Sequence, residues 1–111
     1  MVKVEAVVVR ERVETVIDAV EEETGHVGVT VVEAIGHGRE RGVTHEYRGR
    51  TFESRFLPKA LLAFVVADSL AERVVAAIVD AARTGHSSGD GLCWTSSVAT
   101  VVHHRTGEHL G

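Results

Sequence analysis

In each half of the chain, the spacing of the hydrophobic residues changes from a period of two residues to a period of about 3.6 residues and back. Each half places a β-branched segment first, an amphipathic segment second and another β-branched or apolar segment third. A period of two is typical of strands, and the longer period is typical of helices. We expect strands at residues 2–10, 27–35, 56–67 and 92–102, and helices at residues 11–24 and 69–83.

Both expected helices carry one apolar stripe and a recognisable boundary. Acidic residues crowd the first turns of the first helix, and Thr24-Gly25 supplies its end. The second helix opens on a capping-box pattern from Ser69 to Glu72. The stripes that we expect to face the core are Val13, Val16, Ile17 and Val20 in the first helix, and Leu70, Val74, Ala77, Ile78 and Ala81 in the second.

Two β-α-β units within 111 residues predict a single α+β domain spanning residues 1–111. The expected architecture is the ferredoxin-like βαββαβ sandwich, an antiparallel four-stranded sheet with both helices on one face. We also expect the second half of the first strand to be buried on both faces. Because the helices cover only one side, the other apolar face needs another cover, and a second copy of the chain would supply it.

Residues 37–55, between the two units, show no hydrophobic period. The segment holds five of the twelve basic residues and three glutamates. A compact domain rarely keeps so long a loop without a function, so we expect a flexible loop that serves function.

Composition excludes several classes of protein. The net charge of −4 argues against general nucleic-acid binding. The longest apolar runs are far shorter than the roughly 18 residues of a membrane span, and the N-terminal residues resemble no targeting signal. Cys93, the single cysteine, has no partner for a disulfide or a CxxC motif. These features predict a cytoplasmic protein without direct membrane insertion.

Side chains that could carry chemistry are few. His103, His104 and His109 are the densest histidine group, but adjacent strand residues face opposite sides, so surface histidines are favoured over a metal site. Cys93 and Trp94 stand in an apolar strand, where core packing is the expected role. Spacing reveals no nucleophile with its base and no paired carboxylates, so we expect no enzyme.

The glycine-rich segment at residues 84–91 admits two interpretations. It is a turn between a helix and a strand, or a nest of backbone N–H groups for an anion. By itself the segment favours the turn, because it matches neither the P-loop spacing nor the dinucleotide fingerprint.

Several spaced motifs in order resemble the PII family of signal-transduction proteins. They are TVVEAIGHGR at residues 30–39, EYRG at 46–49, FLPK at 56–59, ARTG at 82–85, GDG at 89–91 and RTGE at 105–108. The resemblance covers nearly the whole chain, which we therefore interpret as a divergent PII-like member.

The resemblance implies a homotrimer that senses adenine nucleotides (ATP, ADP or AMP) in clefts between subunits, with magnesium left open. It also implies a loop that controls a protein partner, a membrane transporter or a metabolic enzyme, in nitrogen metabolism. Carried over by position, Lys59 and Glu40 would meet the effector 2-oxoglutarate, while Arg48, Arg50 and Phe52 would belong to the partner-binding loop. Adenine and ribose would be surrounded by Thr30, Gly36, Gly38 and Val65. The phosphates would lie near Arg39, Gly89, Asp90, Gly91 and Arg105, the last within the C-terminal segment 103–111.

The chain departs from the family pattern where charge matters. Leu92 stands where the family has a lysine, and His103 and His86 likewise replace permanent cations. Glu40 replaces a glutamine, and Phe52 replaces the loop tyrosine that some members modify. We therefore expect reduced affinity for triphosphates and for 2-oxoglutarate.

Two alternatives remain open at this point. The chain could be a PII-like regulator that answers ADP, AMP or another anion and serves a bicarbonate or other small-ion transporter. It could also be a trimeric metal-handling protein of the same shape that uses its histidines.

Overall fold

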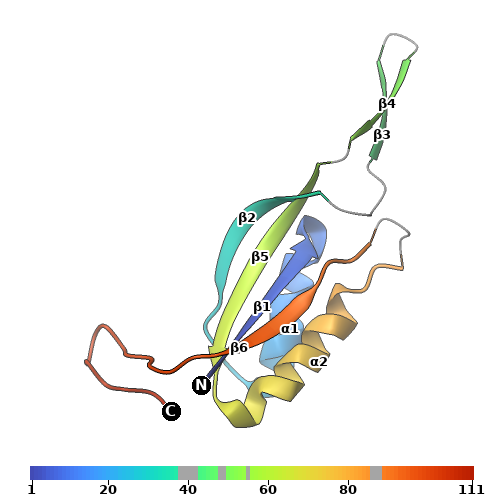
Figure 1. The fold of residues 1–111 in the computed structure, drawn as a ribbon. Helices are drawn as coiled ribbons and strands as arrows, with labels where there is room; N and C mark the ends of the chain where they lie inside the picture. The colour runs from blue at the N-terminus through green and yellow to red at the C-terminus, as the bar shows by residue number, and fades with distance from the viewer. Residues whose placement is uncertain (38–42, 48–49, 55, 86–88) are drawn as a thin grey trace.

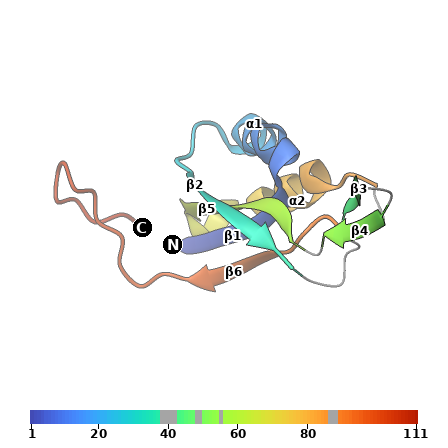
Figure 2. The ribbon, with the colours of Figure 1, turned by 90° about the horizontal axis from the view of Figure 1, so that it is seen from above.

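A computed structural model describes residues 1–37, 43–47, 50–54, 56–85 and 89–111 of the chain. One antiparallel sheet has the order β2-β5-β1-β6, with α1 and α2 both on one of its faces (Figures 1 and 2). This is the expected ferredoxin-like α+β arrangement. The elements are β1 (Val2–Val9), α1 (Val13–Thr24), β2 (Thr30–Gly36), β5 (Leu57–Val66), α2 (Ala71–Ala82) and β6 (Cys93–Ser97), with short 3-10 turns at Arg10–Arg12 and Asp68–Leu70.

The core lies between the sheet and the two helices. Alternate residues of β1 and β5 face the helices, and the register pairs Val4 with Phe64 and Ala6 with Leu62. Burying each large apolar side chain contributes about 1.5–3 kcal/mol, so this layer dominates stability. The predicted stripe of α2 is confirmed, since Val74, Ile78 and Ala81 are buried and Leu70 and Ala77 pack against the core. That of α1 is confirmed at Val13, Val16 and Val20, whereas Ile17 is half-buried and lies outside this core cluster.

No helix covers the opposite face of the sheet in the described part of the chain (Figure 2). Val32 and Trp94 are 50% and 41% exposed there. The expectation that the second half of β1 is buried on both faces is wrong for the single subunit, because Val7 and Val9 stay half-buried. Trp94, expected in the core, lies on this uncovered face, where its indole N–H donates to Glu5.

The segment at residues 37–55 contains regular structure that the sequence analysis missed. β3 (Val43–Tyr47) pairs antiparallel with β4 (Arg50–Ser54) as a separate two-stranded sheet. Val43, Thr44, Tyr47 and Phe52 are strand-favouring residues whose signal was masked by the surrounding charges. Figure 1 shows this hairpin projecting beyond the end of the main sheet.

Three predicted boundaries are also corrected. The last strand stops at Ser97 rather than at residue 102, because Ser97 already pairs with Val2 at the start of β1 and no partner strand continues. β2 begins at Thr30, three residues later than expected. The predicted capping box at the start of α2 is wrong. The residue that caps this helix is Leu70, which makes no side-chain capping bond, and Ser69 lies in the preceding 3-10 turn.

Candidate functional site

The residues expected to bind the nucleotide occupy two opposite ends of the sheet. β2 begins at Thr30, paired with Ala63, and ends at Gly36, paired with Leu57. Six residue-to-residue steps along the strand separate these ends, roughly 20 Å at the usual rise per residue. The single subunit therefore does not bring Thr30 and Gly36 together.

Thr30 and Val65 form the first group. Thr30 pairs with Ala63, and Val65 follows two positions along β5, so both side chains face the uncovered side of the sheet. Val65 is 41% exposed. This end offers a small polar hydroxyl beside an apolar surface, which is a chemistry suited to a heterocyclic ring.

The second group lies at the end of the sheet nearest the hairpin. Gly36 and Lys59 are close neighbours on adjacent strands, and Lys59 is buried, with 1% of its surface exposed. The Gly89–Gly91 segment reaches the same end, because the N–H of Val7 donates to the carbonyl oxygen of Leu92 at 2.9 Å. The structure therefore brings Gly36, Lys59 and this glycine segment to one end of the sheet.

The glycine segment has the backbone of a tight connection. Gly89 and Gly91 adopt φ values of 87° and 91°, in the left-handed region that favours glycine. The hydroxyl of Thr84 donates a hydrogen bond to the carboxylate of Asp90, which joins the two sides of the connection. Asp90 is thus held by a residue of its own segment.

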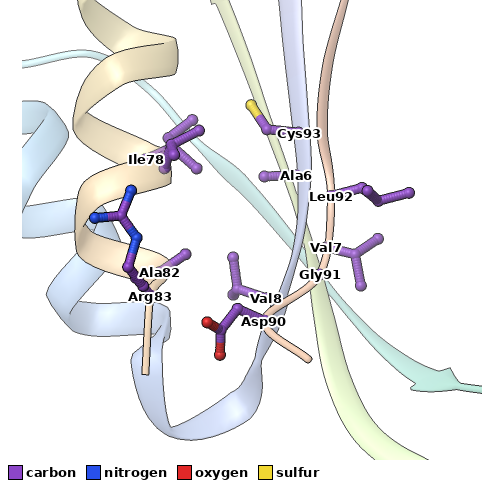
Figure 3. Close-up of a pocket in the computed structure, with 11 residues that line it drawn as sticks. Ala6, Val7, Val8, Ile78, Ala82, Arg83, Asp90, Gly91, Leu92 and Cys93 are labelled. Atoms are coloured by element: carbon purple, nitrogen blue, oxygen red, sulfur yellow. The ribbon is translucent and has the colours of Figure 1, made fainter. Parts of the chain in front are cut away.

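A cavity of about 140 Å³ lies between α2, β1 and the start of β6 (Figure 3). Its walls are mostly apolar, with Arg83, Asp90 and Cys93 as the polar or ionisable side chains. Burial raises the pKa of the Cys93 thiol. Sites for nucleotide-sized ligands usually exceed about 300 Å³, so this cavity is too small to be the nucleotide site.

The end of α2 is fixed by an arginine that sequence analysis did not single out. The guanidinium of Arg12 donates two hydrogen bonds, at 3.0 and 2.6 Å, to the carbonyl oxygen of Ala81. This contact satisfies a carbonyl at the helix C-terminus and holds the start of the 82–91 connection against the first helix. No local pattern marks Arg12, because its partner is 69 residues away in sequence.

The C-terminal segment, to which Arg105 belongs, follows β6 and lies away from the connection between α2 and β6 (Figure 1). The N–H of His103 donates to the carbonyl of Glu108 at 2.9 Å, and Val102 bridges His109. These contacts fold residues 102–109 into a turn that carries Arg105, which is exposed. Arg105 and Gly91 are therefore not neighbours within one subunit.

The remaining predicted residues belong to the segment between β2 and β5. Gly38, Arg39, Glu40 and Arg48 lie outside the described residues, and Arg50 and Phe52 lie in β4, of which the backbone is described. At the base of the segment, the rings of His37 and Phe56 are 4.9 Å apart.

Neither a metal site nor a membrane-spanning helix occurs in the described part of the chain. Within it, no group of three His, Cys, Asp or Glu side chains is arranged to hold a metal ion. None of its helices has the length and apolar character needed to span a bilayer.

Comparison with known proteins gives consistent matches over nearly the full length. The family model described as nitrogen regulatory protein P-II matches residues 1–108. The chain is 43% identical to the nitrogen regulatory protein P-II of Azospirillum brasilense, over all of this chain and 97% of that protein. It is 44% identical to that of Rhizobium meliloti (97% and 95% covered) and 42% identical to nitrogen regulatory protein P-II 2 of Methanothermobacter thermautotrophicus (97% and 92% covered).

Proposed function

Since this chain belongs to the nitrogen regulatory protein P-II family, we propose that it senses adenine nucleotides in clefts between the subunits of a homotrimer. It is a signal-transduction regulator linked to nitrogen metabolism, and not an enzyme. In this proposal the segment at residues 37–55 transmits the bound state to a protein partner, a membrane transporter or a metabolic enzyme. The regulator is cytoplasmic and reaches the membrane by binding such a transporter.

The observation that carries the proposal is the division of the predicted nucleotide residues between two ends of the sheet. Thr30 and Val65 lie at one end, and Gly36 and Gly91 lie at the other. A subunit packed beside the first would place its own Thr30 end against the neighbour's glycine segment. A cleft between subunits then combines the Thr30 end of one chain with the Gly36 end and the glycine segment of the other.

The uncovered face of the sheet supports the same assembly. Val32 and Val65 are exposed there, beside the half-buried Leu61 and Ala63. A large exposed apolar surface usually marks a site of interaction with another protein. Three copies that turn these faces inward would bury the surface and form the clefts in one step.

The loss of two cations expected near the phosphates favours ADP or AMP over ATP. Leu92, 75% exposed, follows Gly91 where the family resemblance expects a lysine, and exposed His103 replaces an arginine. Each charge-assisted phosphate contact contributes roughly 1.5–3 kcal/mol, so losing two weakens triphosphate binding by orders of magnitude.

The expected 2-oxoglutarate site also differs in charge from the family pattern. Lys59 supplies a cation for 2-oxoglutarate, and Glu40 supplies a negative charge where the family pattern has a neutral glutamine. A like-charge pair about 4 Å apart costs on the order of 4 kcal/mol at an effective dielectric constant of 20. We therefore expect weak 2-oxoglutarate binding that the Glu40→Gln substitution strengthens.

Calorimetry on one preparation tests the proposal. AMP, ADP, ATP and zinc chloride are titrated separately into the assembled protein. We expect saturable binding of ADP or AMP with one site per subunit, and weaker binding of ATP. Zinc binding without nucleotide binding would instead favour the metal-handling alternative.

Mixed assemblies test whether each cleft uses two subunits. The Asp90→Ala and Arg105→Ala variants should each lose nucleotide affinity as pure trimers. When the two are unfolded together and refolded as mixed trimers, about one quarter of the clefts should combine an intact half from each chain and regain affinity. No recovery would show that both halves come from the same subunit.

A further inference from the structure

Lys59 is a buried cation in a position that the resemblance assigns to effector binding. It lies on β5 opposite Ala34 of β2, with 1% of its surface exposed. Lysine is almost never fully buried without a partner, and Lys59 does take part in a further interaction. In this conformation its ammonium group is not open to an anion in solvent, so effector binding needs a change at Lys59.

Gly36 provides the surface on which the Lys59 side chain lies. A Cβ atom at Gly36 would stand 2.8 Å from Cγ of Lys59 and 2.9 Å from its Cε. Real Cβ atoms essentially never make such short contacts, so the lysine stem passes directly over the bare backbone of β2. The stem could not keep this path over any residue with a side chain.

The backbone at Gly36 does not itself require glycine. Among the described glycines, those with positive φ are Gly25, Gly85, Gly89, Gly91, Gly107 and Gly111. Gly36 is an ordinary strand residue paired with Leu57. The reason for glycine at position 36 is therefore the neighbouring lysine rather than local conformation.

We infer that Gly36 is the positioning residue that keeps Lys59 buried. Gly36 is the last residue of β2, and only a residue without a Cβ atom leaves room there for the lysine stem. The consequence for effector binding rests on the proposed function, whereas the contact between the two residues does not.

The two lysines of the chain make the inference measurable. Lys3, whose side chain is 42% exposed, is an internal reference for Lys59. The protein without nucleotide is acylated with a limiting N-hydroxysuccinimide ester of acetic acid, and the rate at each lysine is followed by mass spectrometry. We expect Lys59 to react more slowly than Lys3 in the unmodified chain.

The Gly36→Ala substitution should raise the rate at Lys59, relative to Lys3, by about tenfold, as expected when a protected group becomes open to solvent. Gly28→Ala is the matched control, because Gly28 also lacks a positive φ and no described heavy atom lies within 4 Å of its would-be Cβ. It should leave the ratio unchanged. A Lys59 rate in Gly36→Ala equal to that of the unmodified chain would overturn the inference.

A second measurement keeps the inference testable if Gly36→Ala folds poorly. Chemical unfolding is compared for Gly36→Ala, Lys59→Ala and the double variant. If the added methyl group acts through Lys59, its destabilising effect should largely disappear in the Lys59→Ala background. An equal loss in both backgrounds would show that Gly36 acts through something else.

These outcomes are separate from those of the nucleotide titrations. Acylation is measured without any nucleotide, so failure to bind ADP or AMP would refute the proposed function and leave the Gly36–Lys59 contact intact. Conversely, an unprotected Lys59 in a chain that binds nucleotide would refute only the present inference.

Discussion

The carbonyl oxygen of Val7 lies 1.8 Å from the position that a Cβ atom would take at Gly91. The glycine segment therefore rests directly on the backbone of β1, where the N–H of Val7 also donates to Leu92. The nearest atoms are the carbonyl oxygen and carbonyl carbon of Val7. Because they belong to the main chain, no side-chain movement could relieve their clash with a Cβ atom at Gly91. This contact fixes the distance between the predicted phosphate-binding segment and β1.

Substituting Gly91 should destabilise the protein more than substituting a comparable glycine. Gly85→Ala is the matched control, with φ of 78° and no described heavy atom within 4 Å of its would-be Cβ. We expect Gly85→Ala to lower the free energy of unfolding by about 1–2 kcal/mol, from left-handed strain alone. Gly91→Ala should cost about 1–3 kcal/mol more, because the segment must shift. Urea unfolding measures both, and equal losses would contradict the contact.

A charge on the uncovered face of the sheet should prevent assembly. Val32→Asp places a carboxylate on that face, and Ile35→Asp places one on the opposite face of the same strand, at a residue that is 73% exposed. Burying an unpaired carboxylate costs several kcal/mol. Light scattering should therefore return a lower mass for Val32→Asp and a trimer mass for Ile35→Asp. A trimer mass for both would place the interface elsewhere.

Restoring two cations should change the preference among nucleotides. Leu92→Lys together with His103→Arg returns positive charge to both halves of the proposed cleft. The affinity for ATP should rise more than the affinity for AMP, since the added cations meet the outer phosphates. Glu22→Gln is the control, because it changes net charge at an exposed position of α1. Equal gains for ATP and AMP in calorimetry would show that residues 92 and 103 do not face the outer phosphates.

The Cys93 thiol should react slowly until the pH is strongly alkaline. Burial raises the pKa of Cys93, so at about pH 8 less thiolate is present than in an unfolded chain. Iodoacetamide should therefore alkylate the folded protein more slowly than the urea-unfolded protein.

The same raised pKa predicts how stability depends on pH. The folded state holds the thiol proton more tightly, so this contribution to the free energy of unfolding is complete below the ordinary thiol pKa. It is lost as the pH rises through the folded-state pKa. Cys93→Ala should remove that component of the alkaline decline. An identical decline in both proteins would show that other groups cause it.

The fold and most of its core could be predicted from the sequence. The alternating periods located the four strands of the main sheet and the two helices, and the apolar stripes proved to face the core except at Ile17. These features are local, since a residue's place along a strand or helix decides which face it occupies. The hairpin of β3 and β4 was missed although its residues favour strands, because charged side chains obscured the alternation.

The arrangement of the candidate site could not be predicted from the sequence, because it depends on tertiary contacts. Three contacts join residues that are far apart in the chain. They are the contacts of Gly36 with the Lys59 side chain, of Gly91 with the Val7 backbone and of Arg12 with the Ala81 carbonyl. Strand register and helix packing create these contacts, and neither leaves a signal in the local sequence. The same register places Thr30 and Gly36 at opposite ends of one strand, which is the physical reason why the proposed cleft requires two subunits.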